Sequence, residues 1–377
     1  MNVVVAMDSF KGTMSAREAC ELVREGFLEA RPDWRVIVKP MADGGEGTAE
    51  AMLAARGGQW IPLQAPGPLP GRVVDAGYAW FPDRQEALVE MASAAGLPLL
   101  DRTELNPMRT TTRGVGVLMR AAQERGAQRI LLAVGGSATT DGGIGAASEL
   151  GWQFLDHDGN AVSPAGEGLL HIHTIRAPDS PLQMHVDVLC DVNNPLTGPH
   201  GAAAVYGPQK GATPDMVKQL DAGLVHLAAL MRRHFGVEME HVKGAGASGG
   251  LAGGAIAFMQ AELKPGIETI MEASGLRDAL EGADWVITGE GKFDEQSLRG
   301  KVVSGISKLA QTCGTNVGVL AGSVRVAEEV CRAYGVSFAL PTAPAAMPLD
   351  IALPRARSDL KRTAHQWALS QPETGKC

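Results

Sequence analysis

The sequence predicts an α/β protein in which both chain ends build one doubly wound parallel sheet domain, with a large inserted α/β domain between them. Two observations support this prediction. Apolar strand-like runs alternate with amphipathic helical segments up to residue 62 and again from residue 284. The intervening part differs in texture and opens with clustered prolines and glycines. We therefore expect a discontinuous Rossmann-like domain from residues 1–62 and 284–377, and an inserted domain from residues 63–283.

The N-terminal part has the pattern strand, helix, strand, helix. Residues 2–7 form an apolar run, and the spacing of Ser15 and Glu18 is that of a capping box that opens a helix. Residues 35–41 are the second expected strand, and residues 48–56 are the second expected helix. A polar, glycine-rich loop follows each of the two strands.

The same criteria predict the remaining elements. The Pro/Gly stretch after residue 61 is interpreted as a domain crossing. In the insertion we expect strands at residues 72–78, 87–91, 129–134 and 185–191, and helices at residues 114–125 and 214–235. From residue 284 the strand–helix alternation returns, with strands at residues 285–288, 316–320 and 336–341.

Composition and charge exclude several classes of protein. Of the 377 residues, 45% are hydrophobic and 20% charged, and the formal net charge is −8. This acidic balance argues against nucleic acid as the main partner, because a surface that binds the phosphate backbone is normally basic. The five cysteines are scattered and form no Cys-x-x-Cys pair, so we expect a cytoplasmic location. No apolar run approaches the ~18 residues of a membrane span.

Four acidic, glycine-rich loops follow expected strands. They are Asp8-Ser-Phe-Lys11, Asp43-Gly-Gly-Glu46, Thr139-Thr-Asp-Gly-Gly143 and Gly289-Glu-Gly-Lys-Phe-Asp294. Because the carboxyl ends of parallel strands share one edge of a sheet, ligands bind there. We expect four carboxylates and three lysines to gather at that edge: Asp8, Asp43, Glu290 and Asp294, with Lys11, Lys292 and Lys301.

This combination of groups is what Mg²⁺-assisted phosphoryl transfer needs. Carboxylates hold the cation or accept a proton, while lysines and backbone amides stabilise the charge of the phosphates. The alternative is that each acid only caps the next helix or turns its loop. The chain contains no G-x4-G-K-[ST] phosphate loop.

Two further motifs are less specific. Asp187 and Asp191 lie four apart on one expected strand and would face the same side. They could form a carboxylate pair, or one could be a buried capping residue and the other an exposed charge. Asp191 is the stronger catalytic candidate because an Asn-Asn-Pro turn follows it. Gly244, Gly246 and Gly249 match G-x-G-x-x-G, but the preceding strand is poor. A close-packed helix entry or a substrate-facing turn is therefore favoured there over a dinucleotide site.

Taken in order, these motifs resemble the type-1 family of bacterial glycerate kinases over essentially the whole chain. The matching segments are Asp8-Ser-Phe-Lys-Gly12, Ala42-Asp-Gly-Gly-Glu-Gly-Thr48, Gly135-Gly-Ser-Ala-Thr-Thr-Asp-Gly-Gly143, Cys190-Asp-Val-Asn-Asn-Pro-Leu196, Gly207-Pro-Gln-Lys-Gly211, Gly244-Ala-Gly-Ala and Thr288-Gly-Glu-Gly-Lys-Phe-Asp-Glu-Gln-Ser. The resemblance implies transfer of the γ-phosphate of ATP to D-glycerate, with Mg²⁺, in a two-domain α/β kinase without a P-loop. It further implies phosphorylation at the 2-hydroxyl in organic acid catabolism. Thr140 and Tyr206 depart from the family pattern, which often has Asn and Phe there.

The expected site combines the residue patterns with the resemblance. The catalytic candidates are Asp191, Asp8, Lys11 and Lys292; the candidates for binding glycerate and ATP are Ser9, Gly44, Gly45, Ser137, Asn194, Gln209, Lys210, Gln296 and Lys301; those for metal are Asp43, Glu290 and Asp294. The expected setting is a cleft between the two domains. Three alternatives stay open: a kinase for another small hydroxy acid, phosphorylation at the 3-hydroxyl, and a non-catalytic small-molecule sensor.

Overall fold

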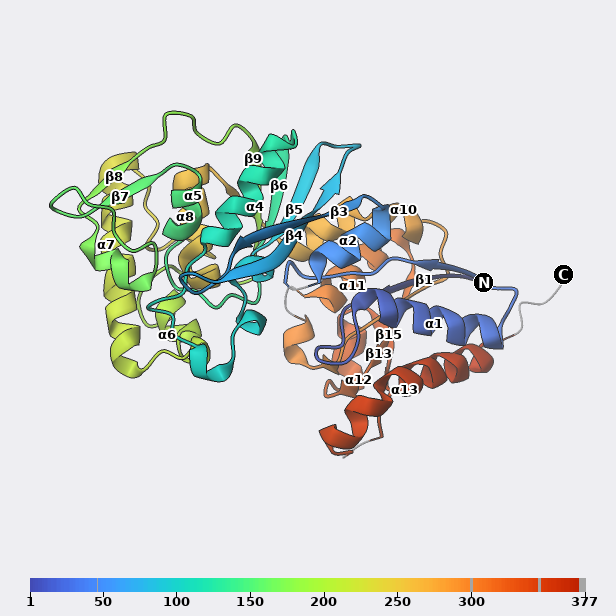
Figure 1. Cartoon of the computed structure of the whole chain (residues 1–377). Helices are drawn as coiled ribbons and strands as arrows, with labels where there is room; N and C mark the ends of the chain where they lie inside the picture. Colours follow the sequence, from blue (N-terminus) through green and yellow to red (C-terminus); the bar gives the residue numbers. More distant parts are fainter. Residues whose placement is uncertain (46, 299–300, 345–346, 373–377) are drawn as a thin grey trace. The chain divides into compact units, whose positions relative to one another are not determined.

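The computed structural model describes residues 1–45, 47–298, 301–344 and 347–372, which form two compact units (Figure 1). The first unit comprises Met1–Asp43, Glu50–Gly57 and Ile267–Cys377, and the second comprises Gly44–Ala49 and Gly58–Gly266. Three residues of the predicted loops, Glu46, Arg299 and Gly300, lie outside the described residues.

The first unit is an α/β domain made from both chain ends. Its elements are β1 (Asn2–Met7), α1 (Ala16–Ala30), β2 (Arg35–Val38), most of α2 (Thr48–Arg56), α9 (Gly266–Ala273), α10 (Leu276–Leu280), β11 (Trp285–Gly289), β12 (Lys292–Phe293), α11 (Val302–Cys313), β13 (Asn316–Ala321), β14 (Ser323–Val324), α12 (Glu328–Ala333), β15 (Val336–Pro341) and α13 (Leu349–Ser370).

Five of these strands form one parallel sheet in the order β15-β13-β11-β1-β2. Numbered along the unit alone, this is the doubly wound order 2-1-3-4-5, with the whole second unit inserted between the second and third strands. Such a sheet changes winding direction between its first and third strands, here β1 and β11, and ligands bind outside the carboxyl ends at that point. The predicted fold class is thereby confirmed.

Helices cover both faces of this sheet, which is why β1 is an unbroken apolar run. Val3, Val5 and Met7 face a core closed by α1 and α13, which lie side by side (Figure 1). Five aromatic side chains pack edge to face or tilted in that core: Phe27, Trp34, Trp285, Phe338 and Trp367. Helix α11 packs against β11 and β13 on the other face.

The start of α1 contains half of the predicted capping box. The hydroxyl of Ser15 accepts a hydrogen bond from the amide of Glu18 at 3.3 Å. The carboxylate of Glu18, which would complete the box, pairs with Arg357 of α13 instead. The start of α1 is therefore capped locally by Ser15 and also held to α13 by the Glu18–Arg357 ion pair.

The second unit is built on a mixed sheet. Its elements are β3 (Gln59–Pro66), β4 (Val73–Phe81), β5 (Glu86–Glu90), α3 (Ala92–Ala95), α4 (Arg113–Glu124), β6 (Arg129–Ala133), α5 (Ile144–Glu149), β7 (Gln153–Leu155), β8 (Thr174–Arg176), β9 (His185–Leu189), α6 (Ala202–Tyr206), α7 (Pro214–Phe235), α8 (Leu251–Met259) and β10 (Glu262–Lys264). The order β10-β9-β6-β5-β4-β3 is parallel from β10 to β5 and antiparallel through β4 and β3.

Two segments differ from their sequence interpretation. The proline-containing stretch is not simply a crossing, because Pro62 and Pro66 lie on β3, an edge strand, where a residue without an amide proton is tolerated. Contacts also place β3 in the second unit and α10 in the first, whereas the sequence boundaries ran through β3 and placed α10 in the insertion. Pairing of β3 with β4 and packing of α10 on α11 explain both differences.

None of the helices in the described part of the chain combines the length and the apolar character that a membrane crossing requires.

Candidate functional site

The carboxyl edge of the first sheet places three predicted acids close together. Asp8 directly follows β1, Asp43 follows β2 after a short loop, and Glu290 directly follows β11. The amide of Asp8 donates to the carbonyl of Gly289 at 2.9 Å, which continues the parallel pairing of β1 and β11 to the sheet edge. The three acids thus surround the point where the sheet changes winding direction.

Asp8 has the most perturbed acid–base chemistry of this group. Burial raises the pKa of Asp8 to about 7, and the nearby carboxylates of Asp43 and Glu290 add to the rise. The amide of Ser9, which donates to Asp8 Oδ1 at 2.6 Å, and the ammonium of Lys11 oppose it. Asp8 therefore exchanges its proton near neutral pH, where a general base is most effective.

Glu290 is the second buried carboxyl. Burial raises the pKa of Glu290, while the hydroxyl of Ser297 and the charge of Lys301 act in the opposite direction. Its Oε1 is buried and has no hydrogen-bond partner among the described residues. Leaving a buried carboxylate oxygen without a partner costs free energy. A cation or a hydrogen-bond donor from a ligand would therefore bind there favourably.

Lysines accompany these acids. Lys292 Nζ lies 2.6 Å from Asp294 Oδ2, and this contact holds the pKa of Asp294 below its usual range. More than half of the Lys292 side chain is exposed, so this ion pair can exchange for a ligand at little cost. The charges of Lys11 and Lys301 act on Asp8 and Glu290 respectively.

The donor set of the first unit fits Mg²⁺. This cation prefers carboxylate oxygens and keeps several waters, and the cluster offers mutually repelling carboxylates together with the unpartnered Oε1 of Glu290. Asp43 and Glu290 would hold the ion, with Asp8 close to both carboxylates. Asp294 is already hydrogen-bonded by Lys292 and by the amide of Gln296, which makes it the weakest of the predicted ligands.

Two smaller predictions in this unit concern loop residues. Ser9 binds Asp8 through its amide. Gln296 has an exposed side chain, and its amide closes a turn on Asp294 Oδ1 at 3.0 Å. Both residues border the acidic cluster, and their contact with a ligand stays a prediction.

The second unit gathers another group of predicted residues. Lys210 is 1% exposed, and its ammonium donates to Ser137 Oγ at 2.8 Å and to the carbonyl of Thr139 at 2.6 Å. Burial lowers the pKa of Lys210 to about 7, an effect that the charge of Asp141 opposes. Ser137 and Lys210, far apart in sequence, therefore lie together, and their contact with a ligand stays a prediction.

Backbone packing locates the predicted glycines. A Cβ on Gly44 would lie 3.0 Å from Leu189, and a Cβ on Gly135 would lie 2.5 Å from the Cα of Gly45. Gly44 thus packs against the last residue of β9, and Gly45 packs against Gly135, which follows β6, at the carboxyl edge of the second sheet. A side chain at Gly135 would collide with the backbone of Gly45.

Asn194 and Gln209 differ in environment. The amide oxygen of Asn194 accepts from the hydroxyl of Tyr206 at 2.7 Å, and its nitrogen donates to the carbonyl of His200 at 2.9 Å. Asn194 therefore orders its own loop. Gln209 is exposed at the 3-10 turn Pro208–Lys210.

Asp191 has a clear structural partner. It lies beyond the last residue of β9, and its Oδ1 accepts from the amide of Gly266, the first residue of α9, at 2.9 Å. This contact favours a capping role. Strand β9 ends at Leu189, so its alternation does not extend to Asp191 and gives no support for placing Asp191 on the same face as Asp187.

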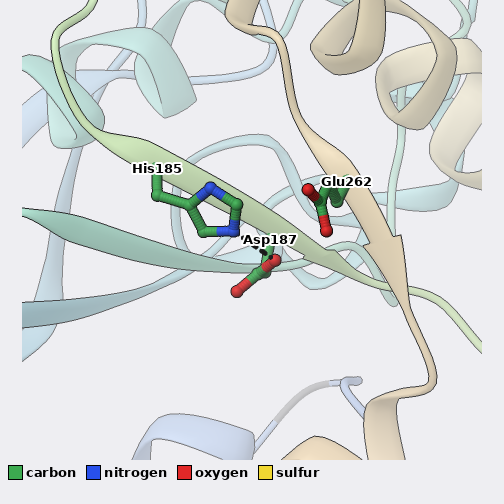
Figure 2. A group of neighbouring side chains, drawn as sticks. All are labelled: His185, Asp187 and Glu262. Carbon is green, nitrogen blue, oxygen red and sulfur yellow. Dashed lines mark hydrogen bonds and ion pairs between the residues drawn. The ribbon is translucent and has the colours of Figure 1, made fainter.

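Asp187 instead belongs to an ion-pair network of the second sheet. Figure 2 shows it beside His185 of the same strand and Glu262 of β10. It is fully buried and lies 2.5 Å from Arg129 and 2.9 Å from His185. Asp187, His185 and Glu262 place ligand atoms within 4.8 Å of one another. Arg129 and Lys264 already supply positive charge to Asp187 and Glu262, so we interpret this group as structural.

The G-x-G-x-x-G match is a close-packed turn. A Cβ on Gly246 would lie 2.1 Å from the carbonyl oxygen of Pro195, and one on Gly249 would lie 2.0 Å from that of Thr139. No strand precedes the motif within the described residues 236–243. The glycines serve loop packing, in agreement with the interpretation favoured from the sequence.

Sequence reasoning missed the group that holds this part of the second unit together. Asp141 is fully buried and accepts from the amide and hydroxyl of Thr112 and from the amide of Gly143. The buried hydroxyls of Thr139 and Ser248 have no hydrogen-bond partner among the described residues. The acidic Gly loop was visible in the sequence, but its burial was not.

The fold and the site define this class of protein: an α/β protein whose acidic and basic side chains gather at the carboxyl edge of a parallel sheet. Comparison with known proteins specifies it further. Residues 3–370 match the model of the glycerate kinase family. Glycerate kinase of Bacillus subtilis strain 168 is 40% identical over 375 residues, which cover 98% of this chain and 97% of that protein. The chain belongs to the glycerate kinase family, as predicted.

Further relatives agree with this assignment. Glycerate 2-kinase of Escherichia coli K12 is 39% identical over 339 residues, 89% of each chain. The crystal structure of a protein from Salmonella typhimurium LT2, proposed as glycerate kinase 2, superimposes with a TM-score of 0.86 at 38% identity and covers 98% of this chain. The two-domain α/β architecture expected from the sequence is shared with that structure.

Proposed function

We propose that this protein transfers the γ-phosphate of ATP to the 2-hydroxyl of D-glycerate in organic acid catabolism in the cytoplasm. The family match over residues 3–370 is the observation that supports the substrate most directly. The name of the Escherichia coli relative, glycerate 2-kinase, supports the position of the hydroxyl. The acidic cluster beside lysines supports phosphoryl transfer as the reaction.

In this proposal different residues of the first unit accept the proton, neutralise phosphate charge and hold the metal ion. Asp8 accepts the proton of the attacking hydroxyl, because its pKa of about 7 matches neutral pH. Lys11, Lys292 and Lys301 neutralise phosphate charge as it shifts toward the leaving group. Mg²⁺, when held by Asp43 and Glu290, would supply further charge neutralisation at the phosphates.

A coupled assay of ADP release tests the proposal. ADP formation that depends on D-glycerate, followed by product NMR that shows 2-phosphoglycerate, is the expected result. A 3-phosphate product would correct the position, and a higher kcat/KM for tartronate or a longer sugar acid would correct the substrate. Absence of ADP above background would contradict the proposal and favour a small-molecule sensor.

A further inference from the structure

A cavity in the second unit is lined by four of the nine histidines of the chain. It has a volume of about 700 Å³ and is formed by residues between 156 and 173 and by one residue of α7. The four histidines are His157, His171, His173 and His226. Because neutral imidazole is the commonest protein ligand of metal ions, this gathering indicates a candidate metal site.

The charged side chains of the same cavity favour a cation. Asp156, Asp158 and Glu167 line it, and none of its described lining residues is a lysine or an arginine. Asp156 accepts hydrogen bonds from the amides of Asp158 and Asn160, and Glu167 accepts one from the hydroxyl of Ser163 at 3.1 Å. These partners carry no positive charge, so the carboxylates leave the cavity with a negative potential.

Two of the imidazoles already lie close together. Strands β7 and β8 pair antiparallel, and the amide of His173 donates to the carbonyl of Leu155 at 2.7 Å, which sets His173 beside the loop that holds His157. The two ring centres are 5.1 Å apart. Two imidazoles on one tetrahedral zinc ion have ring centres about 5 Å apart, because each Zn–N bond is about 2.0–2.1 Å long. The separation of the pair is therefore one that a shared ion allows.

The ring of His226 is oriented by a hydrogen bond to the backbone. Its Nε2 lies 2.7 Å from the carbonyl oxygen of Ile172, and a carbonyl only accepts, so Nε2 carries the proton. In the neutral ring Nδ1 then has the free lone pair. Histidines that bind a metal usually donate their other N–H in this way, which fixes the tautomer. Ile172 directly precedes His173, so the bond also holds His226 next to the pair.

A second group of possible ligands has a different electrostatic environment. Within the described residues, His185, Asp187 and Glu262 form the one group that places three ligand atoms within 4.8 Å of one another, but Arg129 and Lys264 already pair with its acids. The cavity histidines need a rotation of side chains to meet at one ion. The side chain of His157 is 86% exposed, so little packing opposes that rotation.

We propose that His157, His173 and His226 bind one divalent transition-metal ion of the zinc class. Imidazole nitrogen suits zinc, nickel and copper, whereas Mg²⁺ prefers oxygen ligands. This site therefore differs in chemistry from the acidic cluster of the first unit. The bound ion would link the loop after β7, the segment before β8 and helix α7, and so would stabilise the folded second unit.

Calorimetric titration of the untagged full chain with zinc chloride tests the site. Excess Mg²⁺ in the buffer competes for sites made of oxygen ligands and leaves imidazole sites available. We expect the wild type to bind one zinc ion per chain. Binding should be at least about 100-fold weaker in His157→Gln and in His173→Gln, because loss of even an outer partner of a metal ligand commonly costs about 10-fold to 100-fold.

Two matched variants serve as controls. His234→Gln removes an exposed imidazole at the end of α7, and His185→Gln removes the imidazole of the other ligand group. Both should bind zinc like the wild type. Without zinc, His157→Gln and His173→Gln should unfold at the same urea concentration as the wild type, because both positions are exposed. With zinc, the urea midpoint should rise for the wild type and stay unchanged for His173→Gln.

Three results would overturn the inference. They are the absence of zinc binding by the wild type, unchanged binding in His157→Gln or His173→Gln, and a loss of binding in His185→Gln alone, which would assign the ion to the other group. The titration uses no ATP and no glycerate, so its outcome does not depend on the proposed function.

Discussion

At the scale of the residue, Asp8 connects the structure with a measurable pH dependence. Its ordinary pKa of 3.8 rises to about 7 on folding, mainly because the carboxyl group is buried. The folded protein therefore binds this proton more tightly than the unfolded chain does. The stability that the protonated form contributes is present below about pH 4 and is lost as the pH rises through 7.

We predict that Asp8→Asn stabilises the protein more at pH 8 than at pH 5, because asparagine does not ionise. The gain at pH 8 should be on the order of 1–4 kcal/mol, from about 1.36 kcal/mol per pKa unit. Urea unfolding without divalent ions measures it. The same difference between the two proteins at both pH values would contradict the assigned ionisation.

Asp191 tests the alternative base. If it accepts the hydroxyl proton, Asp191→Asn lowers kcat by roughly 10²-fold or more. Its bond to the amide of Gly266 favours a capping role, so we predict a kcat near that of the wild type. An asparagine oxygen still accepts that bond, so the variant should fold. A large fall in kcat in the folded variant would restore Asp191 as the base.

At the scale of the element, the charged residues of β6, β9 and β10 form a network on one sheet. Removing the charge of Asp187 leaves Arg129 without its closest partner. We predict that Asp187→Asn lowers the free energy of unfolding by about 1–3 kcal/mol without changing kcat. Glu262→Gln is the control, because Glu262 forms an exposed ion pair with Lys264. It should change the free energy of unfolding by less than about 1 kcal/mol. Equal effects of both substitutions would refute a special role for the buried pair.

Some strands and some site residues could be predicted from the sequence, and others could not. Strands β1 and β11 were predictable because both faces are buried, which leaves unbroken apolar runs followed by polar loops. Strand β3 was missed because its prolines resemble a linker, although an edge strand tolerates them. The acids after β1, β2 and β11 could be grouped because parallel strands end at one edge. The partners of Asp187, and the absence of a partner for the Thr139 hydroxyl among the described residues, depend on burial, which periodicity does not report.

At the scale of the whole molecule, each unit has a sheet and a core of its own. Trp367 of α13 is 6% exposed and packs against Phe27, Trp34 and Trp285 of the first unit. We predict that Trp367→Ala costs about 3–5 kcal/mol. Hydrogen exchange should lose protection in β1, β11 and β13, while β5, β6 and β9 keep theirs. Equal loss in both sheets would show that the units unfold as one.

We propose that the acidic cluster of the first unit performs phosphoryl transfer. Its most direct test is the rate of D-glycerate-dependent ADP formation by Glu290→Gln, with Glu281→Gln at an exposed position as the control. The substitution keeps the shape of Glu290 and removes the charge that would hold the cation. We predict that kcat falls by about 10²-fold or more for Glu290→Gln alone, in a protein at least as stable as the wild type at pH 8. A kcat for Glu290→Gln close to that of the wild type would contradict the account.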